Sequence, residues 1–413
     1  MKLLNSVTLS STRKTITGFI REHQRFLLPA CLVIAARIIG SLVLFNLLHL
    51  DSGQSYWMTV NWTPSDRFLQ NTILRTLSAQ GVRWPFLYLG WDSAWYLTIV
   101  TRGYGFLDQS YAFFPGLPLF TYLFNLASNN PAVSLVAVSS IFGALWIPIF
   151  QLVAETYADA RTSLRATVSY ALFPYVFLFT TVAYSEGLFM FFTLLSWYFF
   201  RKKALIPSMF LLAVAVIARP PGLLLMLPIL AMVVYSWAAS SRTLSLRGSH
   251  LWLLLPFASF FLLLFYSDIT IGNWFAIGTR TAWNSMPSFV NFISQALQGK
   301  GFGPMHLETV GQLPYSAVWI LFLVAAPIML KFLFDMDRWL WLYSTVFLIP
   351  VLVGGALLSL PRFISFIFPL WLAVELKAFK REKTKYIVPL IVALSLVVGM
   401  LLWSAFIQGE FIA

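Results

Sequence analysis

The chain has 413 residues, of which 59% are hydrophobic and only 10% are charged, and its mean hydropathy is +0.79. Soluble domains are about 25% charged, so this composition excludes an ordinary soluble protein and predicts a multi-pass membrane protein. The net charge of +13 comes mostly from short loops between apolar runs. Basic residues in such loops indicate the orientation in the membrane and contact anionic headgroups. We therefore expect membrane lipids as partners and no nucleic acid.

Apolar runs of about 20 residues predict the membrane spans. We expect one domain over residues 1–413, an all-α membrane protein with about eleven transmembrane helices by this length rule. The predicted spans lie near 27–50, 131–154, 165–182, 186–200, 204–218, 221–238, 251–268, 314–334, 338–358, 362–378 and 386–405.

The apolar run from Phe113 to Leu126 decides the orientation of every later loop. It is short and contains Pro115, Gly116 and Pro118. If this run re-enters the membrane or lies on its surface, the positive-inside rule is obeyed along the whole chain. One side then receives the basic N-terminal tail and the basic loops near 161–165, 201–203, 242–247, 331–338 and 377–385. We therefore predict a re-entrant or surface helix here.

Two long loops, 51–130 and 269–313, then share the opposite, external side. Loops of that length in a compact protein are usually functional rather than simple connectors. The same side receives the short turns 184–186, 219–222 and 360–362. Charged residues that are distant in sequence are thus predicted to meet on one external face.

Asp92 is the leading catalytic candidate in the first long loop. Trp91 and Trp95 flank it, and a partly desolvated carboxylate at a membrane surface suits general-base work. The alternative is a solvated loop residue or a helix N-cap, because a helical sequence, AWYLTIV, follows directly. The residues alone leave both interpretations open.

Arg219 and Arg362 each stand at the external end of an apolar run, next to a proline. Guanidinium groups at these positions could bind a phosphate bidentately. The alternative is that each side chain snorkels to the interface. Arg280, near Trp283 in the second long loop, is a third phosphate-binding candidate.

Glu186 follows Tyr184 at the mouth of a hydrophobic hairpin, where an unpaired carboxylate is costly. It could accept hydrogen bonds from sugar hydroxyls or orient an arginine, or it could be an interfacial acid without a role. His306 in the second long loop could help to bind phosphate or an acceptor, or it could be an ordinary loop residue.

Two further signals are weaker. Asp335-Met336-Asp337 resembles the D-x-D of metal-using nucleotide-sugar enzymes, but it falls on the basic side, so we interpret it as a solvated loop. Arg37 lies within the first apolar run and is expected to face the bundle or a polar cavity.

The sequence WDSAWYLTIVTRGY followed by YAFFPGLPLF resembles the PIG-V family, the GPI mannosyltransferase II group. The pattern of that family runs W-D, then G-Y, then A-F-F-P-x-x-P. The likeness continues through the blocks Ala183–Glu186, Ala218–Gly222, Ile271–Trp274 and Pro361–Phe363, which recur in family order. The Pro-Pro-Gly turn after Arg219, where the family has a small polar residue and Asn, and the short chain favour a bacterial homologue.

The resemblance implies a GT-C glycosyltransferase, a polytopic helical bundle whose long first external loop carries membrane-surface helices. It implies inverting transfer of a mannosyl or related hexosyl residue from polyprenyl- or dolichyl-phosphate-mannose to a lipid or glycolipid acceptor. Asp92 matches the acidic residue that acts as the base in this class. We expect the donor phosphate to contact Arg219, Arg362 and Arg280, and the sugar or acceptor to contact Trp91, Tyr184, Glu186, Trp283 and His306.

No cofactor or metal is expected, because the leaving group is a lipid monophosphate rather than a nucleotide diphosphate. The expected location is the inner membrane of a bacterium or the endoplasmic reticulum membrane of a eukaryote, with an external or lumenal active site. The alternative is a multi-pass lipid or solute transporter, or flippase, without transferase activity. Such a protein predicts inverted repeats and broken helices near the membrane midplane, and the sequence contains no clear repeat.

Overall fold

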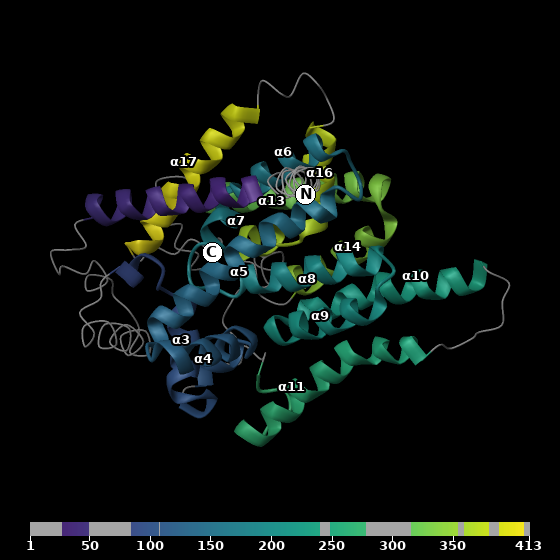
Figure 1. The fold of residues 1–413 in the computed structure, drawn as a ribbon, viewed down its shortest axis with the longest axis horizontal. Helices are drawn as coiled ribbons and strands as arrows, with labels where there is room; N and C mark the ends of the chain where they lie inside the picture. The colour runs from purple at the N-terminus through teal and green to yellow at the C-terminus, as the bar shows by residue number, and fades with distance from the viewer. Residues whose placement is uncertain are drawn as a thin grey trace, which may run out of the picture.

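The computed structural model describes residues 27–48, 84–106, 108–239, 248–277, 315–353, 359–379 and 388–408. All regular elements within these residues are helices (Figure 1), which confirms the predicted all-α class. After a first helix, Leu27–Leu47, the elements are η2 (Trp84–Leu87), α3 (Asp92–Arg102), η3 (Tyr104–Phe106), η4 (Asp108–Ala112), α4 (Gly116–Ser128), α5 (Pro131–Ala154), α6 (Ala160–Ala171), α7 (Pro174–Phe179), α8 (Glu186–Arg201), α9 (Leu205–Ala218), η5 (Pro220–Leu225), α10 (Met226–Ala239), η6 (Gly248–Leu254), α11 (Leu255–Ile271), α13 (Tyr315–Met336), α14 (Arg338–Val353), α15 (Leu360–Ser365), α16 (Phe368–Phe379) and α17 (Val388–Ile407).

Among the described residues, five helical segments are long and apolar enough to cross a membrane. They are Leu27–Leu47, Pro131–Ala154, Pro220–Ala238, Gly248–Ile271 and Pro389–Ile407. The protein is therefore an all-α polytopic membrane protein, as predicted, while the number of eleven spans stays a prediction.

Two predicted spans are each broken into two helices, so the prediction of continuous spans at 165–182 and 362–378 was wrong. Pro174 stands at the start of α7, where its missing N–H costs nothing but the preceding helix cannot continue through it. Pro369 stands at the start of α16 in the same way. The breaks create two short helices, α7 and α15, which pack against each other.

Helix α4 contains most of the run for which a surface or re-entrant helix was predicted. Its 13 residues measure about 20 Å, which is shorter than the hydrocarbon core of about 30 Å. One face packs against α5, while Leu119, Leu123 and Leu126 on another face are exposed. Helices α3 and α4 lie together at one end of the bundle (Figure 1). The membrane position of α4 stays a prediction.

Helices α5 and α8 pack closely at the place where α8 begins. A Cβ atom on Gly187 would lie 2.8 Å from the Cα atom of Gly143 on α5. Because neither residue has a side chain, the two backbones can approach each other as small residues allow in membrane bundles. This contact fixes the beginning of α8, which is Glu186.

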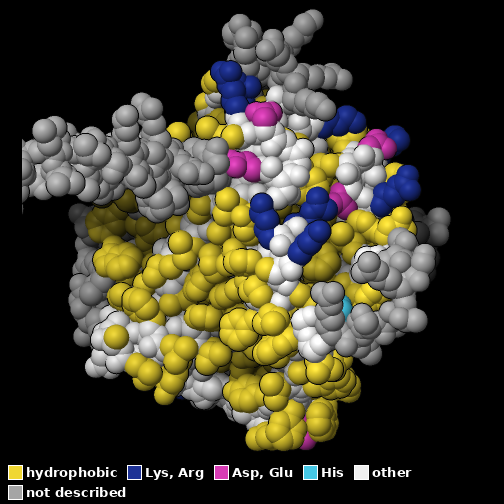
Figure 2. Space-filling view, turned by 45° about the vertical axis from the view of Figure 1, so that its right-hand side comes forward, with side chains coloured by type: hydrophobic (Ala, Val, Ile, Leu, Met, Phe, Trp, Pro, Cys, Tyr) yellow, Lys and Arg dark blue, Asp and Glu magenta, His cyan; other side chains and the backbone are white. Residues whose placement is uncertain are grey.

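Lys and Arg side chains gather along one margin of a broad hydrophobic face (Figure 2). Helix α8 runs from Glu186 to Arg201 and is followed by exposed Lys202 and Lys203. Its 16 residues span about 24 Å. Glu186 and the basic turn are thus at opposite ends of one helix.

Candidate functional site

Asp92 enters the site from a strained turn. The preceding residue, Trp91, has φ 49° and ψ −114°, and a positive φ of this kind costs a residue other than glycine about 1–3 kcal/mol. Trp91 occupies the N-cap position of α3, and Asp92 is the first helical residue. The N-cap alternative for Asp92 is therefore wrong, because its carboxylate is directed to another helix.

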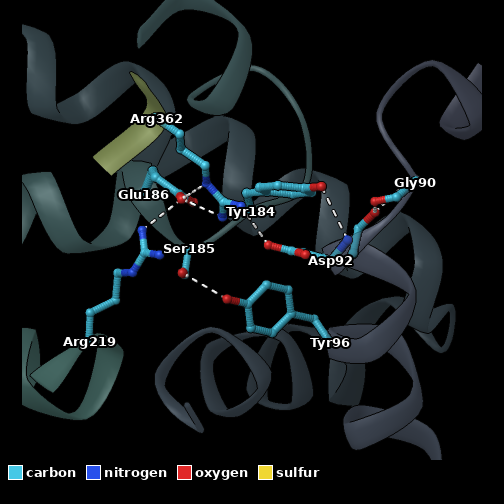
Figure 3. Close-up of polar contacts among 9 residues, drawn as sticks. Gly90, Asp92, Tyr96, Tyr184, Ser185, Glu186, Arg219 and Arg362 are labelled. Atoms are coloured by element: carbon cyan, nitrogen blue, oxygen red, sulfur yellow. Dashed lines mark hydrogen bonds and ion pairs between the residues drawn. The ribbon is translucent and has the colours of Figure 1, made fainter. Parts of the chain in front are cut away.

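Arg362 on α15 joins two acids that are far apart in sequence (Figure 3). Its Nη1 lies 2.7 Å from Oδ2 of Asp92, and its Nε and Nη2 lie 2.6 Å and 2.5 Å from Oε1 of Glu186. The side chain of Arg362 is only 5% exposed, whereas that of Asp92 is 28% exposed. The snorkelling alternative for Arg362 is therefore wrong, since its guanidinium is held inside the protein.

Arg219, at the end of α9, also contacts Glu186. The residue before a proline is driven to extended backbone, and Arg219, before Pro220, has φ −157° and ends the helix. Its Nη1 lies 2.6 Å from Oε1 of Glu186. The structure thus agrees with the possibility that Glu186 orients arginines, and its Oε2 is buried without a hydrogen-bond partner among the described residues.

Aromatic rings surround the guanidinium group of Arg362. Its Cζ lies 4.7 Å from the ring centroid of Phe179, 4.6 Å from that of Tyr184 and 5.9 Å from that of Phe363. Each ring face attracts the cation. The hydroxyl of the buried Tyr184 accepts the backbone N–H of Asp92 at 3.1 Å. Tyr184 therefore contacts both partners of the Asp92–Arg362 ion pair.

Tyr96, Phe179 and Phe363 are site residues that the sequence did not single out. Tyr96 lies one helical turn after Asp92, so both side chains share a face of α3, and its hydroxyl is 2.9 Å from Oγ of Ser185. Burial raises the pKa of Tyr96, so the hydroxyl stays neutral. The spacing of four residues after Asp92 was the only available signal for Tyr96.

The block Ala112–Pro118 packs against the two elements that carry Asp92 and Arg219, namely α3 and the end of α9. A Cβ atom on Gly116 would overlap the backbone of Ala218, the residue before Arg219. The glycine therefore lets the start of α4 pack against the end of α9. Phe113 stacks on Trp95 at a centroid distance of 5.9 Å, which anchors α3 beside α4.

The four charged groups are arranged in a row of alternating sign, Asp92–Arg362–Glu186–Arg219 (Figure 3). Their formal charges cancel, which lowers the cost of burying Glu186 and Arg362. The two ends of the row, Asp92 and Arg219, are 28% and 18% exposed. The row can therefore offer one partly exposed proton acceptor and one partly exposed cation to a bound molecule.

The remaining candidates differ in what the structure describes of them. Arg280, Trp283 and His306 lie outside the described residues, so their predicted roles stay predictions. The ring of Trp91 is half-buried against the core. No group of three or more metal-binding side chains occurs in the described part of the chain, and metal-independent chemistry also stays a prediction.

Two weaker sequence signals have structural roles. Arg37 faces the bundle as expected, where its Nη1 donates to the Gly143 carbonyl at 2.9 Å and its Nη2 donates to Oγ1 of Thr180. Asp337 is buried and caps α14 by accepting two backbone N–H groups. The solvated-loop interpretation was therefore wrong for Asp337, although Asp335 is exposed.

Residues 43–237 match the family model described as Mannosyltransferase (PIG-V), which supports the predicted family and a glycosyltransferase. The matched region contains Asp92, Glu186 and Arg219 but ends before Arg362. Arg362 therefore joins the site through its observed contacts. No curated protein matches the chain significantly.

Proposed function

We propose, because residues 43–237 match the mannosyltransferase (PIG-V) family model, that the chain moves a mannosyl or related hexosyl residue from a polyprenyl- or dolichyl-phosphate sugar to a lipid-linked acceptor, with inversion. One observation carries this proposal. The partly exposed carboxylate of Asp92 lies 2.7 Å from the buried Arg362, in one row of charges with Arg219. A base and two guanidinium groups thus meet at one place.

In the proposed reaction, Asp92 takes the proton of an acceptor hydroxyl while its oxygen attacks the anomeric carbon. A new carbon–oxygen bond forms, and the bond between the anomeric carbon and the donor phosphate oxygen breaks. The electron pair of the broken bond stays on the phosphate. The products are a glycoside with inverted configuration, a lipid phosphate and a protonated Asp92.

Arg219 and Arg362, with Arg280 as a third candidate, stabilise the leaving phosphate. Guanidinium groups bind phosphate oxygens bidentately, and fixed donors at a site of developing charge are a major source of catalysis. The leaving group is a monophosphate, whose oxygens can accept hydrogen bonds from two or three guanidinium groups. The reaction is therefore proposed to need no metal.

The sugar and acceptor are proposed to contact Glu186, Trp91, Tyr184, Trp283 and His306. A buried acceptor without a partner costs about 1–3 kcal/mol, and Oε2 of Glu186 is such an acceptor. A sugar hydroxyl that donates to this atom would remove that cost. We further propose that the exposed leucines of α4 border the lipid tail of the donor.

The site is proposed to face the external or lumenal side of a bacterial inner membrane or of an endoplasmic reticulum membrane. The support is the position of Glu186 and Arg201 at opposite ends of α8. Exposed Lys202 and Lys203 follow Arg201, and basic loops favour the cytoplasmic side.

The test supplies the purified chain with radiolabelled polyprenyl-phosphate-mannose and a lipid extract. Asp92→Asn is expected to lower transfer by about 10²- to 10⁴-fold, the usual contribution of a general base. Asp335→Asn is the matched control, because Asp335 is exposed and lies away from the site, and its transfer should equal that of the unmodified chain. Equal transfer by Asp92→Asn would remove the proposed base, and no transfer to any lipid would favour the transporter alternative.

A further inference from the structure

Arg362 cannot bind a phosphate without bringing it close to a carboxylate. Its Nε and Nη2 contact Glu186, and its Nη1 contacts Asp92. These contacts use three of the five N–H donors, and the two that remain are on Nη1 and Nη2, beside Asp92 and Glu186. A phosphate that approaches Arg362 through them therefore comes next to a carboxylate, and the like charges repel each other.

Asp92 is the partner that can be displaced. Glu186 is fully buried and receives contacts from both Arg362 and Arg219, so its departure would leave charges unpaired in a low-dielectric interior. Asp92 uses Oδ2 for a single contact with Arg362 and is 28% exposed. Water can solvate its carboxylate when that contact breaks.

We propose that Arg362 exchanges Asp92 for the donor phosphate when the donor binds, an inference that rests on the proposed function. The exchange occurs at Nη1, while Glu186 and the rings of Phe179 and Tyr184 hold the rest of the guanidinium in place. It frees Asp92 at the moment when the donor is present. Oδ2 of Asp92 is then no longer held by Nη1 of Arg362, so donor binding makes this carboxylate oxygen available to an acceptor hydroxyl.

The charges balance through the whole reaction. The row of four groups is neutral, and a phosphodiester donor carries one negative charge. After transfer, the proton of the acceptor hydroxyl is on Asp92, and the lipid phosphate carries the second negative charge released by the broken carbon–oxygen bond. The total charge in the site is unchanged, and Arg362 and Arg219 face the phosphate where that charge appears. In the proposed order, donor binding precedes deprotonation of the acceptor, because the exchange first frees Asp92.

The experiment measures binding of polyprenyl phosphate to the full chain in detergent. Asp92→Asn and Asp92→Ala both remove the competing carboxylate, so both are expected to bind polyprenyl phosphate about three- to tenfold more tightly than the unmodified chain. Asp92→Glu keeps the negative charge and should bind as the unmodified chain does. Asp335→Asn removes an equal charge far from the site and should also leave binding unchanged.

The outcomes separate the exchange from the proposed function. Tighter binding by the two neutral variants supports the exchange, and either variant suffices if the other fails to fold. If the unmodified chain binds polyprenyl phosphate but the neutral variants bind it equally or more weakly, the exchange is overturned while the donor class stands. If the unmodified chain does not bind this probe, the donor class is overturned and the exchange with it.

Discussion

Helix α8 has a charged cluster at each end, and the two clusters use their carboxylates differently. At the C-terminal end, Oδ1 of Asp337 accepts the N–H groups of Trp339 and Leu340. Its Oδ2 accepts the Tyr157 hydroxyl at 2.8 Å and lies 3.8 Å from Arg201. Both oxygens therefore have partners, and the cluster fastens α14 to α8.

At the N-terminal end of α8, not every carboxylate oxygen has a hydrogen-bond partner among the described residues. Oε1 of Glu186 receives both arginines, while the buried Oε2 has no partner among the described residues. Asp92 remains partly exposed beside Arg362. Buried polar groups in proteins are nearly always hydrogen-bonded, and exceptions need an explanation. A cluster with every oxygen satisfied is structural, whereas this one keeps an acceptor without a donor and a partly exposed carboxylate, which a ligand's donors could satisfy.

Among the variants that compare the two clusters, Arg362→Lys is expected to have the largest effect on transfer. Arg362→Lys replaces three contacting nitrogen atoms with one ammonium group that has no planar fork. We expect transfer to fall by about 10²- to 10³-fold, as for the loss of a preorganised donor. Arg219→Lys should cost less, because Arg219 has a single ion-pair contact and is more exposed. A larger loss in Arg219→Lys than in Arg362→Lys would contradict this ranking of the two arginines.

Glu186→Gln tests the centre of the same cluster. The neutral amide leaves Arg362 and Arg219 without their shared anion, and breaking a buried pair in this way costs about 3–5 kcal/mol. We expect a clearly lower thermal midpoint in detergent. Added polyprenyl phosphate should restore part of that midpoint, because it supplies a negative charge to the same guanidinium groups. An unchanged midpoint without ligand would show that the Glu186 charge is not needed.

Gly187→Ala tests the packing that holds Glu186 in place. The added methyl group would lie 2.8 Å from the Gly143 backbone, so α8 has to move away from α5. Overpacking of this kind costs about 1–3 kcal/mol. We expect a lower thermal midpoint together with reduced transfer, because Glu186 precedes the moved residue. A matched Gly248→Ala variant has open space around the added methyl group and should retain the original midpoint.

The main site residues could be predicted because charged groups are rare and costly in such an apolar chain. Glu186, Arg219 and Arg362 stood out at the ends of apolar runs for that reason, and Asp92 stood out between two tryptophans in the first long loop. The rings around Arg362 could not be predicted in the same way, since the chain contains 39 Phe and nothing in the local sequence distinguishes Phe179 or Phe363. Only the fold brings them to one guanidinium.

The fold was predictable where an apolar run is uninterrupted. The predicted span 131–154 has the bounds of α5. The breaks before α7 and α16 were missed because the residues on both sides of each proline remain apolar, so hydropathy does not change where the helix ends. Asp337 was misjudged because capping depends on backbone N–H groups, which a charge pattern does not reveal.

The smallest expected effect comes from Asp337→Asn, the same acid-to-amide change as in Glu186→Gln but at the other end of α8. Asparagine caps a helix about as well as aspartate, and the amide oxygen can still accept the N–H groups of Trp339 and Leu340. The lost ion pair with the partly exposed Arg201 is long, at 3.8 Å, and such pairs contribute at most about 1 kcal/mol. We therefore expect a nearly unchanged midpoint and unchanged transfer in the assays used for Glu186→Gln. If both amides lowered stability and transfer equally, the distinction between a structural cluster and a ligand-binding cluster would be lost, because the same chemical change would then matter equally at a satisfied and an unsatisfied carboxylate.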